Sequence, residues 1–232
     1  MFATFSMGPH SVQGSAPSAP LPNRTAGPQT PLLTSAITQE EGQAVRALAI
    51  RQAIYLPLGA MFAAIAFGFT VPGYSSLSQH LSEMGLMPGL PANMLTACIA
   101  VNGAAIIVFS LALLAWGQRF ALTALTSTLF GVAMLSNGVF TTGSPLHGMY
   151  SIGIFSILTP LLFLVELGAD ASRRIAWVAR ATSLLGMAYL WLMLSGFDPQ
   201  PWHGLTQRIA LLPAFGWYTF AALELRRVSG NA

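Results

Sequence analysis

The most prominent feature of the chain is a series of long apolar segments separated by short polar stretches. Crossing about 30 Å of hydrocarbon takes about 20 residues of α-helix. Six segments have that length, and they cover residues 53–71, 94–116, 120–140, 147–167, 175–195 and 207–225. Their apolar residues are continuous rather than alternating, unlike those of a transmembrane β-strand. The pattern therefore predicts an all-α integral membrane bundle of six transmembrane helices.

The composition indicates the same class of protein. Hydrophobic residues make up 54% of the 232 residues and charged residues only 7%, whereas a soluble domain carries about 25% charged residues. So little charge could not cover the surface of a soluble fold. This excludes a soluble enzyme and a nucleic-acid-binding protein, and it makes the lipid bilayer the expected partner. The single cysteine, Cys98, lies within an apolar segment, so neither an intrachain disulfide nor a thiolate metal site is expected.

The first 40 residues differ from the rest of the chain. They are rich in Pro, Ser and Ala and cannot bury enough apolar surface to offset the entropy of ordering, so a disordered tail is expected. They lack the basic segment and apolar core of a signal peptide. A short helical lead-in is expected over residues 39–51, and the six-helix membrane domain over residues 41–228.

The arginines are distributed unequally between the two sides that six spans define. One side, with its helix ends, has nine of them: Arg24, Arg46, Arg51, Arg119, Arg173, Arg174, Arg180, Arg226 and Arg227. The other side has only Arg208. Because basic residues accumulate on the cytoplasmic side of membrane proteins, both termini are predicted to be cytoplasmic and the protein to lie in the inner (cell) membrane.

Polar residues that suit binding or catalysis gather on the predicted outer side. Each of the three external loops holds one histidine, and these loops or the adjoining helix ends also carry two acids and the lone arginine. Two amides lie in the outer halves of the second and third spans. The candidate ligand-binding residues are His80, Glu83, Asn102, Asn137, His147, Asp198, His203 and Arg208.

Two of the histidines occur in the same Pro-x-His-Gly motif. Residues 145–148 and 201–204 both have it, each just before an inward-running helix. Proline suits the first turn of a helix, and a histidine there sits at the positive end of the helix dipole, which disfavours the imidazolium. A neutral imidazole can ligate a metal, accept a proton or hydrogen-bond a headgroup. The alternative is that such polar residues only cap the helix.

The densest polar run covers residues 74–85, directly after the first span. If it is helical, His80 and Glu83 are i,i+3 neighbours, while Leu77, Leu81 and Met84 share another face. This predicts a short amphipathic helix on the membrane surface, docked back over the bundle. Glu83 is expected to pair with His80 or with Arg208, or else to cap its own turn.

The same run is similar to a motif of a bacterial membrane family. The segment Pro72-Gly-Tyr-Ser-Ser-Leu-Ser-Gln-His-Leu-Ser-Glu-Met-Gly85 resembles the "P-G-Y-S…I-S-E-L-G" stretch of the family catalogued as domain of unknown function 998. A Pro-rich loop before the second span and a histidine at the start of the fourth, His147, are also similar. The resemblance covers about residues 50 to 225. It implies a six-helix membrane protein without an established substrate, and the Pro-x-His-Gly at 201–204 has no counterpart in it.

Three functions fit these observations. The first is a binding site for a small molecule or lipid headgroup at the outer mouth of the bundle, in a non-enzymatic protein such as a transporter. The second is a membrane-embedded hydrolase in which His80, His147 and His203 hold a zinc-like ion, with Glu83 or Asp198 as fourth ligand or as base. The third is a structural or assembly role. The sequence does not choose among them, and whether the protein is an enzyme stays open.

Overall fold

The computed structural model describes residues 30–140, 142–147 and 154–230, with side chains from residue 40 onwards. Residues 40–232 form one compact unit, and the described part of the other unit, residues 30–39, begins the first helix. Residues 1–29, which include most of the expected disordered tail, lie outside the described residues. The first helix begins at Thr30, upstream of residue 39, where the helical lead-in was expected to start.

The described residues contain helices and no strands. The α-helices are α1 (Thr30–Gln52), α2 (Leu56–Gly68), α3 (Leu90–Trp116), α4 (Ala121–Val139), α5 (Ile154–Leu167), α6 (Arg173–Ser195) and α7 (His203–Gly230). Short 3-10 helices are η1 (Leu81–Leu86), η2 (Gln118–Phe120), η4 (Gly168–Asp170) and η5 (Gln200–Trp202).

Four helical segments in the described part of the chain are long and apolar enough to cross a membrane. They are Glu40–Gly68, Leu90–Trp116, Gln118–Val139 and Arg173–Ser195. The prediction of an all-helical membrane protein is therefore confirmed, and the count of six spans stays a prediction.

The first expected span, residues 53–71, contains a turn and the helix α2 rather than one continuous helix. Helix α1 ends at Gln52, and α2 begins at Leu56 after a turn over residues 53–55. Pro57 lies in the first turn of α2. A proline is tolerated there because its missing N–H would have no intrahelical partner. Pro160 and Pro213, by contrast, lie inside α5 and α7.

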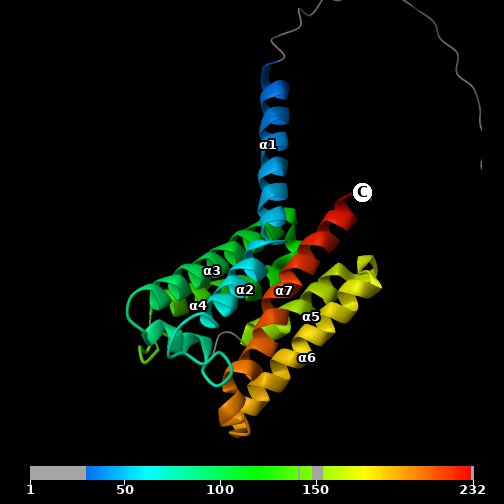
Figure 1. The fold of residues 1–232 in the computed structure, drawn as a ribbon. Coiled ribbons are helices and arrows are strands. Elements are labelled where there is room, and N and C mark those ends of the chain that lie inside the picture. The colour runs from blue at the N-terminus through cyan, green and yellow to red at the C-terminus, as the bar shows by residue number, and fades with distance from the viewer. Residues whose placement is uncertain (1–29, 141, 148–153, 231–232) are drawn as a thin grey trace, which may run out of the picture. The chain divides into compact units, whose positions relative to one another are not determined.

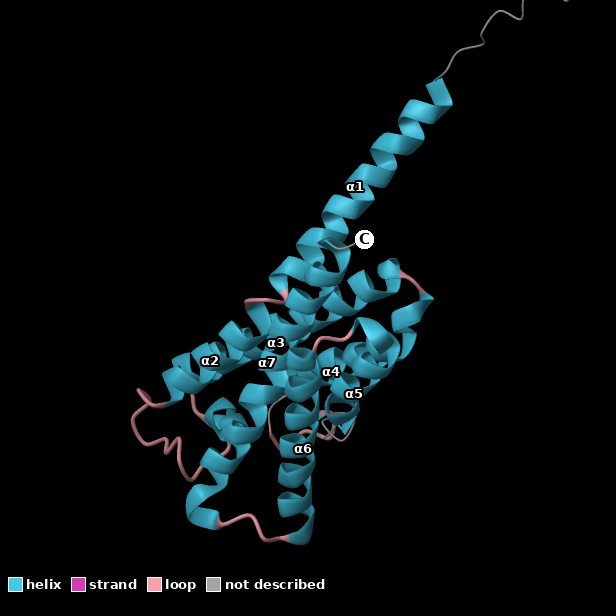
Figure 2. Ribbon diagram, turned by 90° about the vertical axis from the view of Figure 1, so that its right-hand side faces the viewer, coloured by secondary structure: helices cyan, strands magenta, loops and turns pink. Residues whose placement is uncertain are grey.

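Helices α2 to α7 lie side by side as a bundle (Figures 1 and 2). Each helix packs against the next one along the chain, and α7 packs against α2, which closes a ring. The core holds large side chains that are almost wholly buried, among them Phe109, Phe163, Phe215, Trp217 and Tyr218.

Helices α3 and α4 approach each other closely. A Cβ on Gly103 would lie 2.7 Å from the carbonyl oxygen of Gly131, and a Cβ on Gly131 would lie 2.9 Å from that of Gly103. Two glycines facing each other allow this approach, as small residues do between membrane helices. No motif in the sequence indicated this contact between Gly103 and Gly131.

The bundle has two chemically different ends. At one, called the arginine end, Arg46 and Arg119 bond to backbone carbonyls of neighbouring segments, and Arg227 pairs with Glu224 at 2.9 Å. At the other, called the histidine end, the segment of residues 74–87, the loop of residues 142–147 and the segment of residues 197–203 come together. The histidine end contains most of the candidate site residues.

The expected amphipathic helix at the histidine end is shorter than predicted. Only Leu81–Leu86 is helical, and it is a 3-10 helix rather than an α-helix over residues 74–85. Leu81 and Met84 are buried as expected, whereas Leu77 is exposed. The segment docks on the bundle: Leu81 donates its N–H to Oε1 of Gln207 at 2.7 Å, and η1 packs against α3.

Candidate functional site

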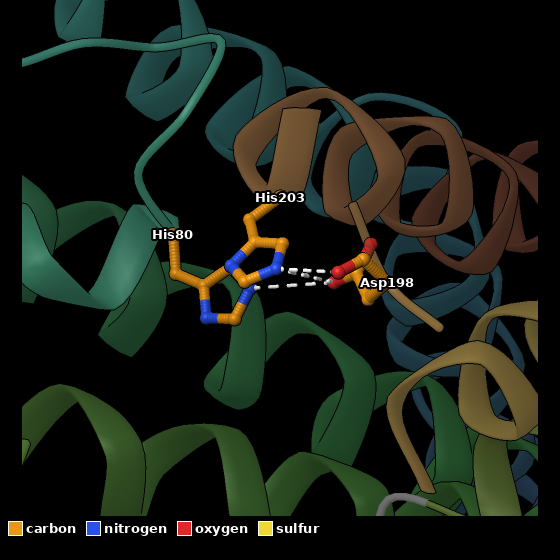
Figure 3. A group of neighbouring side chains, drawn as sticks. All are labelled: His80, Asp198 and His203. Atoms are coloured by element: carbon orange, nitrogen blue, oxygen red, sulfur yellow. Dashed lines mark hydrogen bonds and ion pairs between the residues drawn. The ribbon is translucent and has the colours of Figure 1, made fainter. Parts of the chain in front are cut away.

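His80, Asp198 and His203 form one cluster at the histidine end (Figure 3). Oδ2 of Asp198 lies 3.9 Å from Nε2 of His80 and 3.9 Å from Nε2 of His203. The two imidazole rings are stacked, with centroids 5.4 Å apart and planes inclined by 28°. One nitrogen or oxygen from each residue lies within 4.8 Å of the others. Imidazole nitrogens together with a carboxylate oxygen are the donors that bind zinc-like ions in proteins.

Local backbone structure positions each member of this cluster. His80 directly precedes η1, where its N–H donates to Oε1 of Glu83 at 2.8 Å and its carbonyl accepts a hydrogen bond from the phenol of Tyr74 at 3.0 Å. His203 is the first residue of α7. Asp198 lies between α6 and η5, and its side chain is only 8% exposed.

The hydrogen bonds of the cluster differ from member to member. Oδ1 of Asp198 accepts a hydrogen bond from Thr206 Oγ1 at 2.7 Å. Nε2 of His203 lies 2.8 Å from the backbone carbonyl oxygen of Asp198. Nε2 of His80 is buried and has no hydrogen-bond partner among the described residues. The cluster therefore includes one buried nitrogen whose hydrogen-bonding capacity is unused.

Arg208 joins the segment that carries His80 to the helix that carries His203. Its side chain is buried, and it donates to the carbonyl oxygens of Gln79 at 3.1 Å and Gly204 at 2.6 Å and to the phenol of Tyr74 at 2.6 Å. Since Tyr74 in turn bonds to the carbonyl of His80, the guanidinium links α7 to the segment that carries His80. Burial raises the pKa of the Tyr74 phenol, and this outweighs the lowering by the nearby Arg208 cation.

Gly204 explains the glycine of the second Pro-x-His-Gly motif. A Cβ on this residue would lie 2.6 Å from the carbonyl oxygen of Ser76, and even closer to that of Gln79. Only glycine leaves room for the loop to cross the start of α7 at this distance. The motif at residues 201–204 thus places His203 beside His80, while Gly148 of the first motif lies outside the described residues.

Of the three alternatives expected for Glu83, the pairing with Arg208 is wrong and the capping of its own turn is the one that the structure shows. Glu83 accepts hydrogen bonds from the N–H of His80 and from Gln79 Nε2, both within its own turn. Arg208 bonds instead to two carbonyls and a phenol. The guanidinium bonds to the backbone carbonyl of Gln79 in the loop rather than to the carboxylate of Glu83, and this bond joins the loop to α7.

A cavity of about 390 Å³ lies between the helices next to the cluster. Its wall is mostly apolar, with contributions such as Met61, Leu95, Phe130, Ile157 and Leu190. Polar side chains also line it, among them His80, Asn137, Thr142, His147 and Gln207. His80 belongs both to this wall and to the cluster, so the two features adjoin each other.

The remaining candidates fall outside the cluster. His147 lies on the cavity wall, with Nδ1 2.6 Å from the carbonyl oxygen of Phe140 and Nε2 3.5 Å from Thr142 Oγ1. Asn137 also faces the cavity, and its Oδ1 has no hydrogen-bond partner among the described residues. Asn102 is fully buried on α3 away from the cavity wall. The structure therefore brings together two of the three histidines that were expected to share an ion, and of the two acids expected as fourth ligand or base it places Asp198 beside them.

Sequence reasoning missed the residues that support the site. Tyr74, Thr206 and Gln207 orient the cluster and its loop through hydrogen bonds. Of these, only Thr206 carried a usable signal, because a residue three positions after His203 lies on the same face of a helix. The roles of the other two depend on contacts between distant segments.

These features define a helical membrane protein with a polar cluster and a cavity at one end of its bundle. The chain matches the family described as "Protein of unknown function (DUF998)" over residues 54–224, and it belongs to that family. The matched region begins just before α2 and ends within α7, so it includes the cluster and the cavity. Neither the curated proteins nor the solved structures contain a match to this chain.

Proposed function

We propose that the protein binds an amphiphilic molecule, such as a lipid with a small uncharged headgroup, in the cavity beside the histidine cluster. The cavity is the observation that supports this proposal. Its volume of about 390 Å³ is within the range of roughly 300–1,000 Å³ for ligand pockets, which are mostly apolar with a few polar groups that orient the ligand. An apolar chain matches the wall, and a hydrogen-bonding group matches the polar side chains.

The lining residues also define the chemistry of the polar group. The lining includes imidazole, amide and hydroxyl side chains, and in the described part of the chain no Asp, Glu, Lys or Arg lines the cavity. A fully charged headgroup would be desolvated there without a counterion, which is costly. A hydroxyl, ester or amide group can form hydrogen bonds with the imidazole, amide and hydroxyl side chains of the lining.

We further propose a six-span topology in which α5 and α7 also cross the bilayer. The closed ring of α2 to α7 supports it, because α5 and α7 each pack between two neighbours of the same bundle. The arginine distribution supports a cytoplasmic arginine end and cytoplasmic termini in the inner (cell) membrane. Residues 1–40 then form a cytoplasmic tail and residues 41–228 the membrane domain, with the cavity at the outer side.

The cavity is tested by photolabelling. The probe is a monoacylglycerol with a diazirine in its acyl chain, added to the full-length protein in lipid nanodiscs, and labelled peptides are mapped by mass spectrometry. We expect labels on cavity-lining residues of α3, α6 and α7. Ala210→Phe, which fills the cavity from α7, should reduce this labelling at least fivefold.

The matched control is Ala63→Phe, which adds the same side chain at an exposed position of α2. It should leave the labelling unchanged. Labels confined to outward-facing residues, or equal labelling of both variants, would show that the probe only reports the surrounding lipid and would overturn the proposal.

A further inference from the structure

We infer that His80, Asp198 and His203 bind a divalent transition-metal ion, for which Zn²⁺ is the best match. Two imidazoles and one carboxylate form a mixed nitrogen and oxygen donor set that suits zinc, whereas Mg²⁺ and Ca²⁺ prefer oxygen ligands alone. This inference concerns the cluster itself and does not depend on the ligand proposed for the cavity.

The distances fit a site that closes when the ion binds. Bonds of about 2.1 Å in a tetrahedral arrangement place ligand atoms about 3.4 Å apart. The donor atoms of the cluster lie within 4.8 Å of one another, and the two distances from Nε2 to Oδ2 of Asp198 are 3.9 Å. The donors therefore have to approach one another by about 0.5–1.5 Å when the ion binds.

The unused nitrogen of His80 is the second observation that indicates a ligand. Its Nε2 is buried, lies 3.9 Å from the carboxylate and has no hydrogen-bond partner among the described residues. A buried polar atom without a partner is energetically unfavourable. A metal ion at the cluster supplies the missing partner. For His203, the ion replaces the contact of Nε2 with the carbonyl of Asp198.

The residues around the cluster orient the ligands as they do in known metal sites. Thr206 donates its hydroxyl to Oδ1 of Asp198 at 2.7 Å, which leaves Oδ2 directed at the two imidazoles. Tyr74 fixes the backbone of His80 through its carbonyl. Hydrogen bonds of this kind set the orientation of metal ligands, and their removal weakens metal binding by about 10–100-fold.

Three protein ligands leave at least one coordination position for water or for another molecule, as in zinc sites that act on a substrate. Because His80 also lines the cavity, an ion bound by His80 adjoins the polar part of that cavity. The cluster is therefore assigned as an open site beside a ligand cavity.

The test measures metal binding directly, with purified full-length protein that carries a tag without histidines. After treatment with a chelator, the protein is dialysed against Zn²⁺ and the bound metal is measured by mass spectrometry, with affinity obtained by competition with a fluorescent chelator. We expect about one Zn²⁺ per chain. His203→Ala and Asp198→Asn should each lower the affinity more than 100-fold, and Thr206→Val, which removes only the hydrogen bond to Asp198, should lower it about tenfold.

His147→Ala is the matched control, because it removes a histidine from the same end of the bundle but outside the cluster. It should bind Zn²⁺ like the unaltered chain. Co²⁺ in the unaltered protein gives a second readout that needs no variant: intense visible absorption bands indicate four-coordinate binding. Absence of these bands, zinc binding unaffected by His203→Ala and Asp198→Asn, or equal loss with His147→Ala would overturn the assignment.

Discussion

Arg208 is a buried cation that has no carboxylate within ion-pair distance in the described part of the chain. Its charge is balanced by oxygen dipoles, namely two backbone carbonyls and the phenol of Tyr74. Two nitrogens of one planar guanidinium reach these three oxygens, and a lysine has only one nitrogen. At this position the shape of the side chain therefore matters as much as its charge.

Replacing Arg208 by lysine should thus destabilise the protein. Each lost hydrogen bond to a charged group costs about 1.5–3 kcal/mol, so we expect Arg208→Lys to lower the melting temperature of the purified protein by several degrees. Arg180→Lys, at an exposed position of α6, is the control and should leave the melting temperature unchanged. Equal effects of both variants would contradict the role given to the guanidinium.

Tyr74 gives a prediction about pH. Burial raises the pKa of its phenol above the ordinary value of about 10, so the folded state holds the phenolic proton more tightly than the unfolded state does. The associated stability is fully present below pH 10 and is lost as the pH rises through the higher pKa of the folded state. Tyr74→Phe has no such proton, so its melting temperature should fall less steeply between pH 9 and pH 11 than that of the unaltered chain.

Because Tyr74→Phe also removes the bonds to Arg208 and to the carbonyl of His80, it should have a lower melting temperature at pH 7. Parallel pH profiles for the two proteins would show that the phenol is not responsible for the loss at high pH.

At the scale of elements, the contact between α3 and α4 depends on two glycines. A methyl group on Gly103 would lie 2.7 Å from one backbone oxygen and 2.8 Å from the N of Leu135, so the helices would have to move apart. Overpacking of this kind costs about 1–3 kcal/mol.

We therefore expect Gly103→Ala and Gly131→Ala each to lower the melting temperature, with a double variant that is less than additive because both changes separate the same pair of helices. Gly59→Ala on α2, where an added Cβ would meet nothing within 4 Å, is the control. A loss of stability as large in the control as in Gly103→Ala would indicate a general effect of removing glycine from a helix.

At the scale of the whole molecule, topology can be tested with single cysteines, because Cys98 is the only natural one and is buried. In a Cys98→Ala background, Gln200→Cys reports on the histidine end, and Gln118→Cys and Ala169→Cys report on the arginine end; all three positions are exposed. A membrane-impermeant maleimide added to intact spheroplasts should label only the first. Labelling of Gln118→Cys and Ala169→Cys on opposite sides would rule out six spans.

Several properties of this protein follow from the sequence alone. Long apolar segments and few charges determine a helical membrane protein. In hydrocarbon the backbone N–H and C=O groups must be paired within the protein, and a continuous apolar segment pairs them within its own helix. The histidines could be grouped at one end from their place between apolar segments. The docking of Leu81 and Met84 also followed from the sequence, because burying apolar side chains is favourable.

Other properties were decided by the tertiary structure. His80 and His203 meet because Gly204 admits two carbonyls of the loop and Arg208 binds one of them, and neither contact leaves a periodic pattern in the sequence. Asp198 lies beside the two imidazoles, whereas His147 bonds to the carbonyl of Phe140, and the sequence does not distinguish these two arrangements. Hydropathy reports how deep a residue lies in the bilayer, whereas its neighbours around the bundle are set by helix packing and by single close contacts.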